Sequence, residues 1–430
     1  MRILYLAAGA GATYCGACIR DLGLVAGLRR RGHQVDLLAL YTPLKGDDAD
    51  VAAGSAIYYG GVNVWLQQAA ALFRHTPPGV DRLLDSGPLL SLASRLAIET
   101  DPRTLGPMTV SVLAGTGGRQ RKELERLVAR AGRPPRPDVV NITNSLLSGV
   151  APELRRLGVP VVCNVQGEDS FLEYLPGPYR AESVRLMRRN AESVDLFLAP
   201  CEAHRRKMAA LLGLPDAKVR VVRVGIDAAR YAPLGPRPRQ PFVVGHLSLV
   251  NPRKGLDILV EAVGELVNEE HRDVALRAAG RVADPGFWGA VRQSVARASL
   301  GPRFVHEGEL DLDGKIAFLR RASVFCAPSR VEESRGMAAM EAMAAGVPVV
   351  VPASGVFPEL VETTGGGVLV PPRDARALAR AIAALMDDPD RADALGRAAA
   401  EGIRTRYAFP AMVDGVERAY ADAAARRVVA

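Results

Sequence analysis

Two glutamates eight residues apart, Glu333 and Glu341, have the spacing that most directly indicates chemistry. The stretch that contains them, C-A-P-S-R-V-E-E-S-R-G-M-A-A-M-E-A-M-A-A-G-V-P-V-V-V-P, predicts a buried strand over 322–327, a polar turn, a helix beginning near Gly336 and a short second strand. Free backbone N–H groups and the helix dipole favour a phosphate at such a helix start. A diphosphate bound there would place Glu333 near sugar hydroxyls on one side and Glu341 near a ribose on the other.

Composition alone is equally consistent with an Ala-rich helix between two strands, because Ala, Met and Glu are good helix formers. The stretch nevertheless resembles the E-x7-E signature of the retaining glycosyltransferases of family 4, P-S-x-x-E-G-F-G-x-x-x-x-E-A-M-A-x-G-x-P-V-V. The usual G-F-G is Ser334-Arg335-Gly336 here, so a cation replaces the aromatic residue where the diphosphate would lie. The positions that match in register are Pro328, Ser329, Glu333, Gly336, Glu341, Ala342, Met343, Ala344, Gly346, Pro348, Val349 and Val350.

The resemblance also implies the residues that hold the donor and do the chemistry. The family's G-R-L-x-x-x-K-G places its diphosphate-binding lysine at Lys254, whereas its arginine falls on Leu249. Arg253 and Arg335 are the candidate replacements, and an exposed surface position is the alternative for Arg253. The expected catalytic residues are Glu333, Lys254 and Arg335. The expected donor-binding residues are Glu341, Gly336, Met337, Ala338, Arg253, Gly280, Arg281, Gly308, Glu309, Leu310 and Gly16.

The acceptor is expected in the first half of the chain. Gln166 takes the position where relatives often carry a His, and Glu168 and Asp169 follow it. A Gln cannot act as a base but can orient a hydroxyl by hydrogen bonds, whereas either carboxylate could assist deprotonation or simply face water. A Gly-rich turn contributes the remaining expected acceptor-binding residues, Gly11, Tyr14 and Cys15.

The resemblance implies a retaining, metal-independent transfer of a sugar. The donor would be a UDP- or GDP-sugar, and the acceptor would be a small molecule, a glycolipid or a glycan. No cofactor is expected beyond the nucleotide sugar. A role in an actinobacterial natural-product pathway, such as that of the lincosamide-pathway S-glycosyltransferase, is one expectation for this chain, and glycolipid or polysaccharide assembly is the commoner role in the family. The alternatives are a glycosyltransferase-like binding protein without turnover, suggested by Leu249 and Gln166, and a non-hydrolytic sugar-nucleotide epimerase.

The elements that must position these residues alternate between strand and helix in both halves of the chain. Alternation of this kind predicts parallel sheets with right-handed crossovers, and the resemblance implies the GT-B arrangement of two Rossmann-like domains. The expected boundaries are an acceptor domain over 1–230 with an insertion at about 45–130, a Pro-rich linker over 231–241, a donor domain over 242–405, and a helix over 406–430 that returns to the first domain.

The opening segment predicts a βαβ unit, with a strand over 1–7, a helix over 19–31 and a strand over 34–40. Its glycines 9, 11 and 16 do not form G-x-G-x-x-G, which gives no support for a dinucleotide fingerprint. The C-G-A-C pair at 15–18 could instead be a redox pair at a helix start. The other cysteines are scattered, so a shaping role in the acceptor loop is favoured and a zinc site is not.

The composition is that of a soluble globular protein, with 48% hydrophobic and 24% charged residues among 430. The net charge of +8 comes from basic residues spread along the chain, six of them Lys, which argues against a nucleic-acid partner. No apolar run is long enough for a membrane span, and the N-terminus lacks a signal pattern, so a cytoplasmic location is expected. Contact with a membrane surface and a homodimer stay open.

Overall fold

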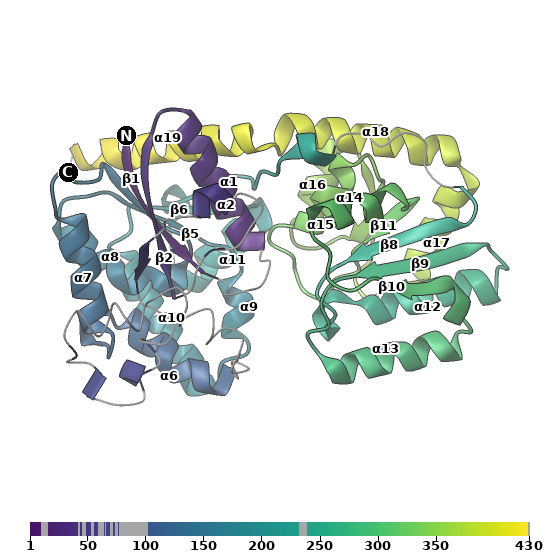
Figure 1. Cartoon of the computed structure of the whole chain (residues 1–430), viewed down its shortest axis with the longest axis horizontal. Helices are drawn as coiled ribbons and strands as arrows, with labels where there is room; N and C mark the ends of the chain where they lie inside the picture. The colour runs from purple at the N-terminus through teal and green to yellow at the C-terminus, as the bar shows by residue number, and fades with distance from the viewer. Residues whose placement is uncertain are drawn as a thin grey trace. The chain divides into compact units, whose positions relative to one another are not determined.

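The chain divides into two compact units, residues 1–224 with 412–430 and residues 225–411. Figure 1 shows the path of the chain through both units. The structure, a computed structural model, describes residues 1–9, 16–41, 44, 49–52, 56–58, 64, 66–68, 72–73, 76, 102–231 and 239–428.

The described strands of the first unit form one parallel sheet in the order β3-β2-β1-β4-β5-β6-β7. Its central strands are runs of buried apolar residues, which is typical of a parallel sheet covered by helices on both faces. The strands are β1 (Arg2–Ala8), β2 (Gln34–Leu40), β3 (Ala56–Tyr58), β4 (Val139–Ile142), β5 (Val161–Asn164), β6 (Leu196–Ala199) and β7 (Val219–Val221).

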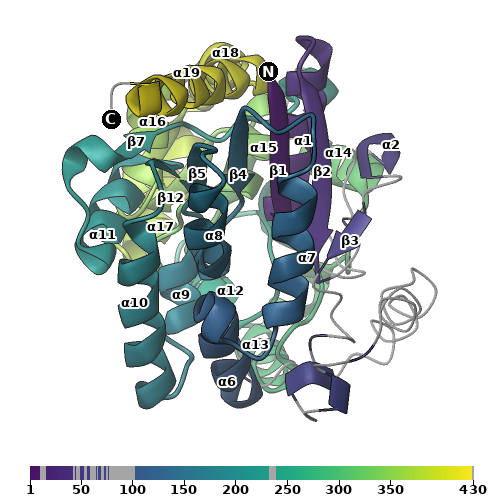
Figure 2. The ribbon, with the colours of Figure 1, turned by 90° about the vertical axis from the view of Figure 1, so that its left-hand side faces the viewer.

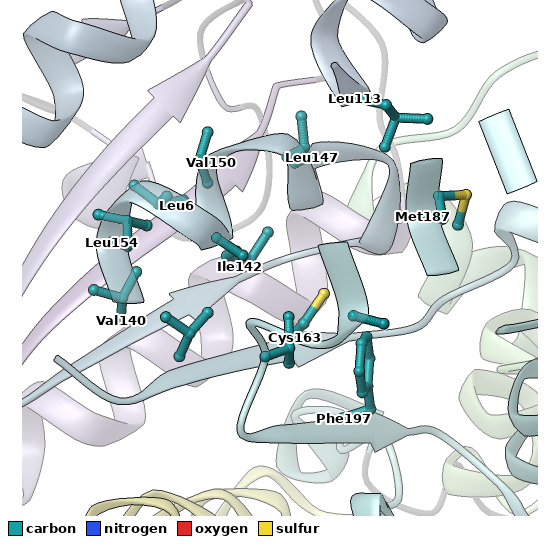
Figure 3. Close-up of a cluster of buried hydrophobic side chains, with 14 of the residues drawn as sticks. Leu6, Leu113, Val140, Ile142, Leu147, Val150, Leu154, Cys163, Met187 and Phe197 are labelled. Atoms are coloured by element: carbon teal, nitrogen blue, oxygen red, sulfur yellow. The ribbon is translucent and has the colours of Figure 1, made fainter. Parts of the chain in front are cut away.

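Helices cover this sheet, as Figure 2 shows. Leu113, Ile142, Leu147, Cys163 and Phe197 belong to the buried core that strands and helices share (Figure 3). The helices are α1 (Gly16–Arg30), α2 (Ala49–Ala52), α6 (Pro102–Leu113), α7 (Arg121–Ala131), α8 (Ala151–Arg156), α9 (Glu168–Leu172), α10 (Gly177–Ala191), α11 (Glu202–Leu212) and α19 (Phe409–Val428).

The second unit repeats this plan with a parallel sheet in the order β10-β9-β8-β11-β12-β13. The strands are β8 (Phe242–Leu247), β9 (Val274–Ala279), β10 (Phe304–His306), β11 (Val324–Cys326), β12 (Val349–Pro352) and β13 (Gly367–Val370). The helices are α12 (Leu256–Asn268), α13 (Pro285–Arg297), α14 (Leu312–Arg320), α15 (Met337–Ala344), α16 (Phe357–Thr364), α17 (Ala375–Asp387) and α18 (Pro389–Arg406). The predicted fold class, two Rossmann-like α/β domains with parallel sheets, is confirmed.

The first boundary lies earlier in the chain than the sequence predicted. Residues 225–230 belong to the second unit and not to the acceptor domain, because Ile226 forms a parallel bridge with Ala408. The Ile226 N–H donates to the Tyr407 carbonyl at 2.8 Å, and the Phe409 N–H donates to the Ile226 carbonyl at 3.1 Å. The structure thus places both chain passages between the units at this bridge, whereas residues 232–238 of the expected linker lie outside the described residues.

The C-terminal helix α19 packs on the first unit from residue 412 onward. Val416 and Tyr420 are fully buried there, and a Cβ added to Gly27 of α1 would lie 2.5 Å from a methyl group of Val413. Much of the expected insertion lies outside the described residues. Its described part includes α7, which adds Leu124 and Leu127 to the core, so that helix is a packing element. Among the described residues, no helix is both long and apolar enough to cross a membrane.

Candidate active site

The E-x7-E stretch folds as a loop followed by α15, and Gly336 is the residue at the junction. Its φ of +64° is in the left-handed region that favours glycine. The Met340 N–H donates to the Gly336 carbonyl at 3.0 Å, so the helical hydrogen bonding begins at Gly336. The N–H groups of the first turn, Met337 and Ala338 among them, therefore point out of the helix start, where an anion is favoured.

Glu333 lies just before that helix start and forms an ion pair with Lys254. The Ser329 hydroxyl donates to the same oxygen, Oε1, at 2.9 Å. Burial alone would raise the pKa of Glu333, but Lys254, Ser329 and the nearby charge of Arg335 outweigh it and leave the pKa below its usual value. Glu333 is therefore a carboxylate at neutral pH.

The turn that carries Lys254 is fastened to the loop that carries Glu333. The carbonyl of Arg253 accepts the Arg330 N–H at 2.8 Å, and the Ser329 hydroxyl oxygen lies 3.2 Å from the same carbonyl oxygen. Gly255 follows with a φ of +71°, and an added Cβ would lie 2.0 Å from the Pro328 carbonyl oxygen. Arg253 thus has a main-chain role in joining two segments that lie far apart in the sequence.

Arg330 reinforces the same junction and was not identified from the sequence. Its guanidinium donates to both carboxylate oxygens of Asp257, at 2.7 and 2.6 Å, and to the Pro252 carbonyl at 2.7 Å. A bidentate pair of this kind fixes orientation as well as charge. The signature residues around it gave no hint of Arg330, because its partners are 73 and 78 residues away.

Glu341 is buried in α15 at 5% exposure, and Lys315 of α14 is its partner. The ammonium donates to Glu341 Oε1 at 2.9 Å, and the Lys315 side chain is 15% exposed. The sequence analysis missed Lys315. A lone lysine in a helix gives no signal of its own until the fold brings the two helices together.

The loops after β8, β9 and β10 meet beside this region. The Gly280 N–H donates to the Gly308 carbonyl at 2.6 Å, and an added Cβ on Gly280 would lie 1.8 Å from the Ser248 carbonyl oxygen. The Arg281 carbonyl accepts the 250 N–H at 3.0 Å, which pairs these loops further. Arg281 and Glu309 are exposed, and Leu310 is half-buried.

At the loop after β8, Leu249 is 44% exposed and places an apolar side chain where the family's arginine was expected. Three residues earlier, His246 is buried. Its Nδ1 lies 2.9 Å from the Cys326 carbonyl oxygen, so Nδ1 donates, and Nε2 lies 2.7 Å from the Ser248 hydroxyl. Burial lowers the pKa of His246 to about 4, so the ring is neutral and its Nε2 accepts.

In the first unit, Gln166, Glu168 and Asp169 lie together at the end of β5 and the start of α9. Glu168 is buried, and its carboxylate accepts N–H groups from Ser145, Gln166 and Gly167 at 2.8, 2.6 and 2.9 Å. That geometry makes Glu168 a loop-fastening residue rather than one that faces water. Asp169 is also buried and pairs with Lys207 at 2.7 Å.

The remaining expected acceptor-side residues, Gly11, Tyr14 and Cys15, lie outside the described residues, whereas Gly16 is the first residue of α1. The helix therefore starts at Gly16, whereas the sequence predicted a start at residue 19. Cys18 is buried, and its Sγ lies 3.8 Å from the Ala8 carbonyl oxygen. Among the described residues, no group of His, Cys, Asp and Glu side chains has the arrangement of a metal site.

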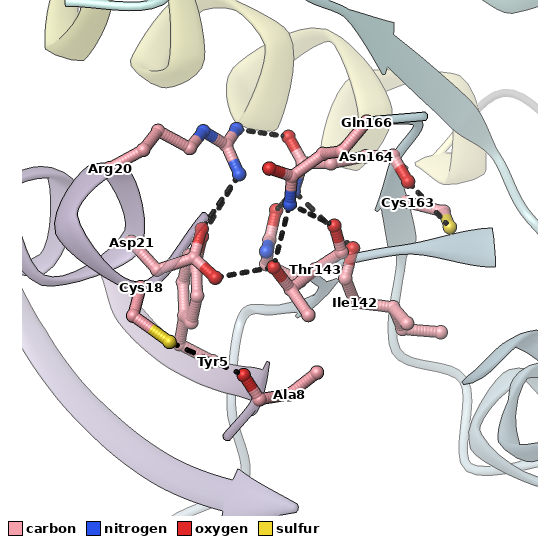
Figure 4. Close-up of polar contacts among 11 residues, drawn as sticks. Tyr5, Ala8, Cys18, Arg20, Asp21, Ile142, Thr143, Cys163, Asn164 and Gln166 are labelled. Carbon is pink, nitrogen blue, oxygen red and sulfur yellow. Dashed lines mark hydrogen bonds and ion pairs between the residues drawn. The ribbon is translucent and has the colours of Figure 1, made fainter. Parts of the chain in front are cut away.

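A buried polar cluster next to Gln166 was not expected from the sequence (Figure 4). Arg20 and Asp21 of α1 form an ion pair at 2.8 Å, with side chains 6% and 1% exposed. Tyr5 of β1 donates to Asp21 at 2.7 Å, and Thr143, which follows β4, also donates to Asp21. Two adjacent charged residues just before the apolar run of α1 were the signal that could have indicated this cluster.

Comparisons with known proteins agree with this architecture. Residues 234–402 match the family described as glycosyl transferases group 1, and residues 19–225 match a glycosyl transferase 4-like domain. The putative colanic acid biosynthesis glycosyltransferase WcaL of Escherichia coli (strain K12) is 30% identical over 287 residues, covering 64% of this chain and 68% of WcaL. A glycogen synthase of Mycobacterium tuberculosis (strain H37Rv) is 29% identical over 297 residues, covering 66% of this chain and 69% of the synthase.

Two solved structures share the fold. Anabaena Alr3699/HepE in complex with UDP and glucose has a TM-score of 0.69 at 18% identity, covering 97% of this chain and 99% of that one. Sucrose-phosphate synthase (tll1590) from Thermosynechococcus elongatus has a TM-score of 0.70 at 20% identity, covering 98% of each chain. The fold, the two family matches and the similarity to WcaL agree, and the chain therefore belongs to the glycosyltransferases of group 1, with a GT-B fold.

Proposed function

We propose that the protein is a retaining, metal-independent glycosyltransferase that uses a UDP- or GDP-linked sugar. The observation that supports this most is the ion pair between Lys254 and Glu333 immediately before the start of α15. It gathers a cation, a carboxylate and a helix start in one unit, which is what binding a sugar diphosphate requires.

The diphosphate would bind at Lys254, at Arg335 and at the first N–H groups of α15. A lysine ammonium has three N–H donors, and one of them reaches Glu333, so two can serve phosphate oxygens. Arg335 would supply the cation that the family's arginine provides elsewhere. These groups offset the charge that develops on the leaving phosphate, and no metal ion is needed for that purpose in the proposed reaction.

The two glutamates would recognise the sugar and the ribose. Glu333 Oε1 already accepts from Lys254 and Ser329, so Oε2 would accept a hydroxyl of the transferred sugar. Glu341, with its charge balanced by Lys315, would accept the ribose hydroxyls. The glycine turns at 280 and 308 would allow the nucleotide to approach the backbone closely.

The acceptor would bind at Gln166 in the first unit and would be a small molecule, a glycolipid or a glycan. Its nucleophile, a hydroxyl or a thiol, would attack the anomeric carbon from the face that the phosphate leaves. The leaving phosphate oxygen would take the nucleophile's proton. The bond from the anomeric carbon to the acceptor forms as the bond to the phosphate breaks, with retention of configuration, and the nucleoside diphosphate is released.

Turnover of UDP-, GDP- and dTDP-glucose by purified protein in EDTA tests the proposal. Nucleotide release is measured with and without a panel of sugar, lipid and thiol acceptors, and the anomeric configuration of product is read by proton NMR. Glu333→Gln and Lys254→Met should each lower turnover by about 100-fold or more. Glu401→Gln is the matched control, because Glu401 forms an exposed ion pair with Arg404 in the same unit.

Turnover within twofold of wild type in both site variants would refute the assignment, and an inverted product would refute the retaining mechanism. Binding of a nucleotide sugar without hydrolysis or transfer to any acceptor would instead identify a sugar-nucleotide-binding protein.

A further inference from the structure

The side chain of Gln166 has one orientation that its surroundings allow. Its Nε2 donates to the Thr143 carbonyl at 2.6 Å and to the Thr143 hydroxyl at 2.9 Å. A carbonyl oxygen can only accept, so the amide nitrogen, not the amide oxygen, must face Thr143. The carboxamide nitrogen is then held by Thr143, and any group that meets the carboxamide oxygen must donate to it.

The hydrogen bond to Asp21 explains why the Thr143 hydroxyl accepts from Gln166. To accept from Gln166, that hydroxyl must direct its own proton elsewhere, and it donates to Asp21 Oδ2 (Figure 4). The other oxygen, Oδ1, accepts from Tyr5 at 2.7 Å and from Arg20 at 2.8 Å. Burial raises the pKa of Tyr5, so its hydroxyl keeps the proton that it donates.

No neutral isostere of Asp21 can do the same. In Asp21→Asn the amide oxygen must face Tyr5 and Arg20, since both donate, and the amide N–H then faces Thr143. Thr143 would have to accept from residue 21 and could no longer donate to it. Its proton would point toward the amide of Gln166, where two donors would meet.

We propose that Asp21 is a positioning residue, which acts through Thr143 to hold the Gln166 carboxamide with its nitrogen toward Thr143 and its oxygen turned away from it. An acceptor substrate that meets this oxygen must present a hydrogen-bond donor, a hydroxyl, thiol or ammonium group, and not a carboxylate or phosphate. The inference about the substrate rests on the proposed function, which places the acceptor at Gln166. The inferred orientation of the Gln166 side chain does not depend on the proposed function.

Side-chain amide exchange measures the orientation directly. The chain has seven glutamines, so selective ¹⁵N labelling gives few carboxamide signals, and the Gln166→His spectrum identifies that of Gln166. In the wild-type protein both Gln166 amide protons should exchange with D₂O at least about tenfold more slowly than those of exposed Gln293.

Thr143→Val removes the hydroxyl and keeps the carbonyl. It should speed the exchange of one Gln166 amide proton about tenfold and leave its geminal partner slow. Asp21→Asn should speed the same proton, whereas Thr143→Ser should behave as wild type. Asp216→Asn, in a carboxylate whose side chain is 85% exposed, is the control. A loss of folding alone would speed both protons and lower the melting temperature of the variant.

Equal exchange of both protons in wild type, Thr143→Val and Asp21→Asn, with melting temperatures within about 4 °C, would overturn the proposal. So would a wild-type spectrum in which both Gln166 protons exchange as fast as those of Gln293.

Hydrolysis of UDP-glucose and GDP-glucose tests the catalytic consequence, because water is then the acceptor and can donate to Gln166. Thr143→Val and Asp21→Asn should lower kcat for glucose release about tenfold and change the KM for the donor less than twofold. Unchanged kcat in both variants would overturn the link to the acceptor. If the wild-type protein hydrolyses neither donor and transfers from neither, the proposed function fails, while the exchange rates still decide the role of Asp21.

Discussion

Glu333 Oε1 accepts hydrogen bonds from a lysine ammonium and a serine hydroxyl, and these contacts keep Glu333 ionised in the proposed donor site. The pKa of Glu333 is held below its usual value. A carboxyl group whose pKa is lower in the folded than in the unfolded chain stabilises the folded chain. The stabilisation is complete above the pKa of the unfolded chain, about 4.3. It is lost as the pH falls through the lower pKa of the folded chain.

The difference in unfolding free energy between wild type and Glu333→Gln should therefore be about 1–2 kcal/mol and constant from neutral pH down to about 5. It should shrink as the pH falls further. Urea denaturation in a Trp65→Phe background measures it, since Trp288 of the second unit is then the only tryptophan. A difference that grows as the pH falls below 5 would contradict the ionised state of Glu333.

Lys315 and Glu341 form a second pair, more buried than the first. Lys315→Met should lower the unfolding free energy by about 2–3 kcal/mol, because it leaves the Glu341 carboxylate buried without its cation. Lys315→Met/Glu341→Met should recover at least half of that loss, since no charge is then left buried. The same Trp288 fluorescence measures both variants.

The double variant should also bind UDP and GDP weakly, and titration calorimetry checks that expectation. Additive losses in the two single variants and the double variant would show that the residues do not act as a pair.

The sequence indicated Glu333, Glu341 and Lys254 as candidates because each stands at a fixed spacing within a short motif. Lys315, Arg330 and Asp21 gave no comparable signal. Their partners are 26, 73 and 122 residues away, and the pairing depends on which helix faces meet. Local spacing cannot specify such contacts, whereas the path of the chain through the sheet can.

At the scale of elements, two glycines with nearly equal φ angles allow the energetic cost of the backbone conformation to be distinguished from the cost of steric overlap. Gly255 and Gly213 have φ of +71° and +67°. An added Cβ on Gly255 would lie 2.0 Å from the Pro328 carbonyl oxygen, whereas one on Gly213 would meet nothing within 4 Å. Gly213 ends α11, and Gly255 joins the Lys254 turn to α12.

Gly213→Ala should cost about 1 kcal/mol from the backbone angle alone. Gly255→Ala should cost about 3 kcal/mol or more, since the Pro328 loop must also move, and UDP affinity should fall with it. Thermal unfolding and UDP titration of the two variants measure these effects. Equal destabilisation would show that the contact with Pro328 does not constrain the turn.

Several strands of both sheets could be predicted because buried parallel strands are short apolar runs between turn residues. The strand over 34–40 coincides with β2, and the helix predicted near Gly336 begins as expected. Helices α13, α14, α16 and α17 were not assigned beforehand. The break between α18 and α19 at Tyr407 and Ala408 depends on the bridge to Ile226, which a local pattern cannot show.

At the scale of the whole molecule, the proposed donor residues belong to one unit and the proposed acceptor residues to the other. Hydrogen-exchange mass spectrometry with UDP should protect peptides that contain residues 246–255 and 329–341 of the second unit. Peptides of the first unit over 139–166 should change little, because the nucleotide would contact only the second unit. Protection confined to the first unit would reverse the proposed assignment of donor and acceptor.

Both passages of the chain between the units lie side by side where Ile226 pairs with Ala408, and this has a consequence for biosynthesis. The first unit cannot bury Val416 and Tyr420 until the last helix has left the ribosome, whereas the second unit is already complete in sequence at residue 411. Completion of the first unit therefore follows synthesis of the second, which differs from the usual N-terminal-first order of domain folding. A nascent chain with residues 1–411 outside the ribosome would carry every residue of the second unit and a first unit that still lacks residues 412–430.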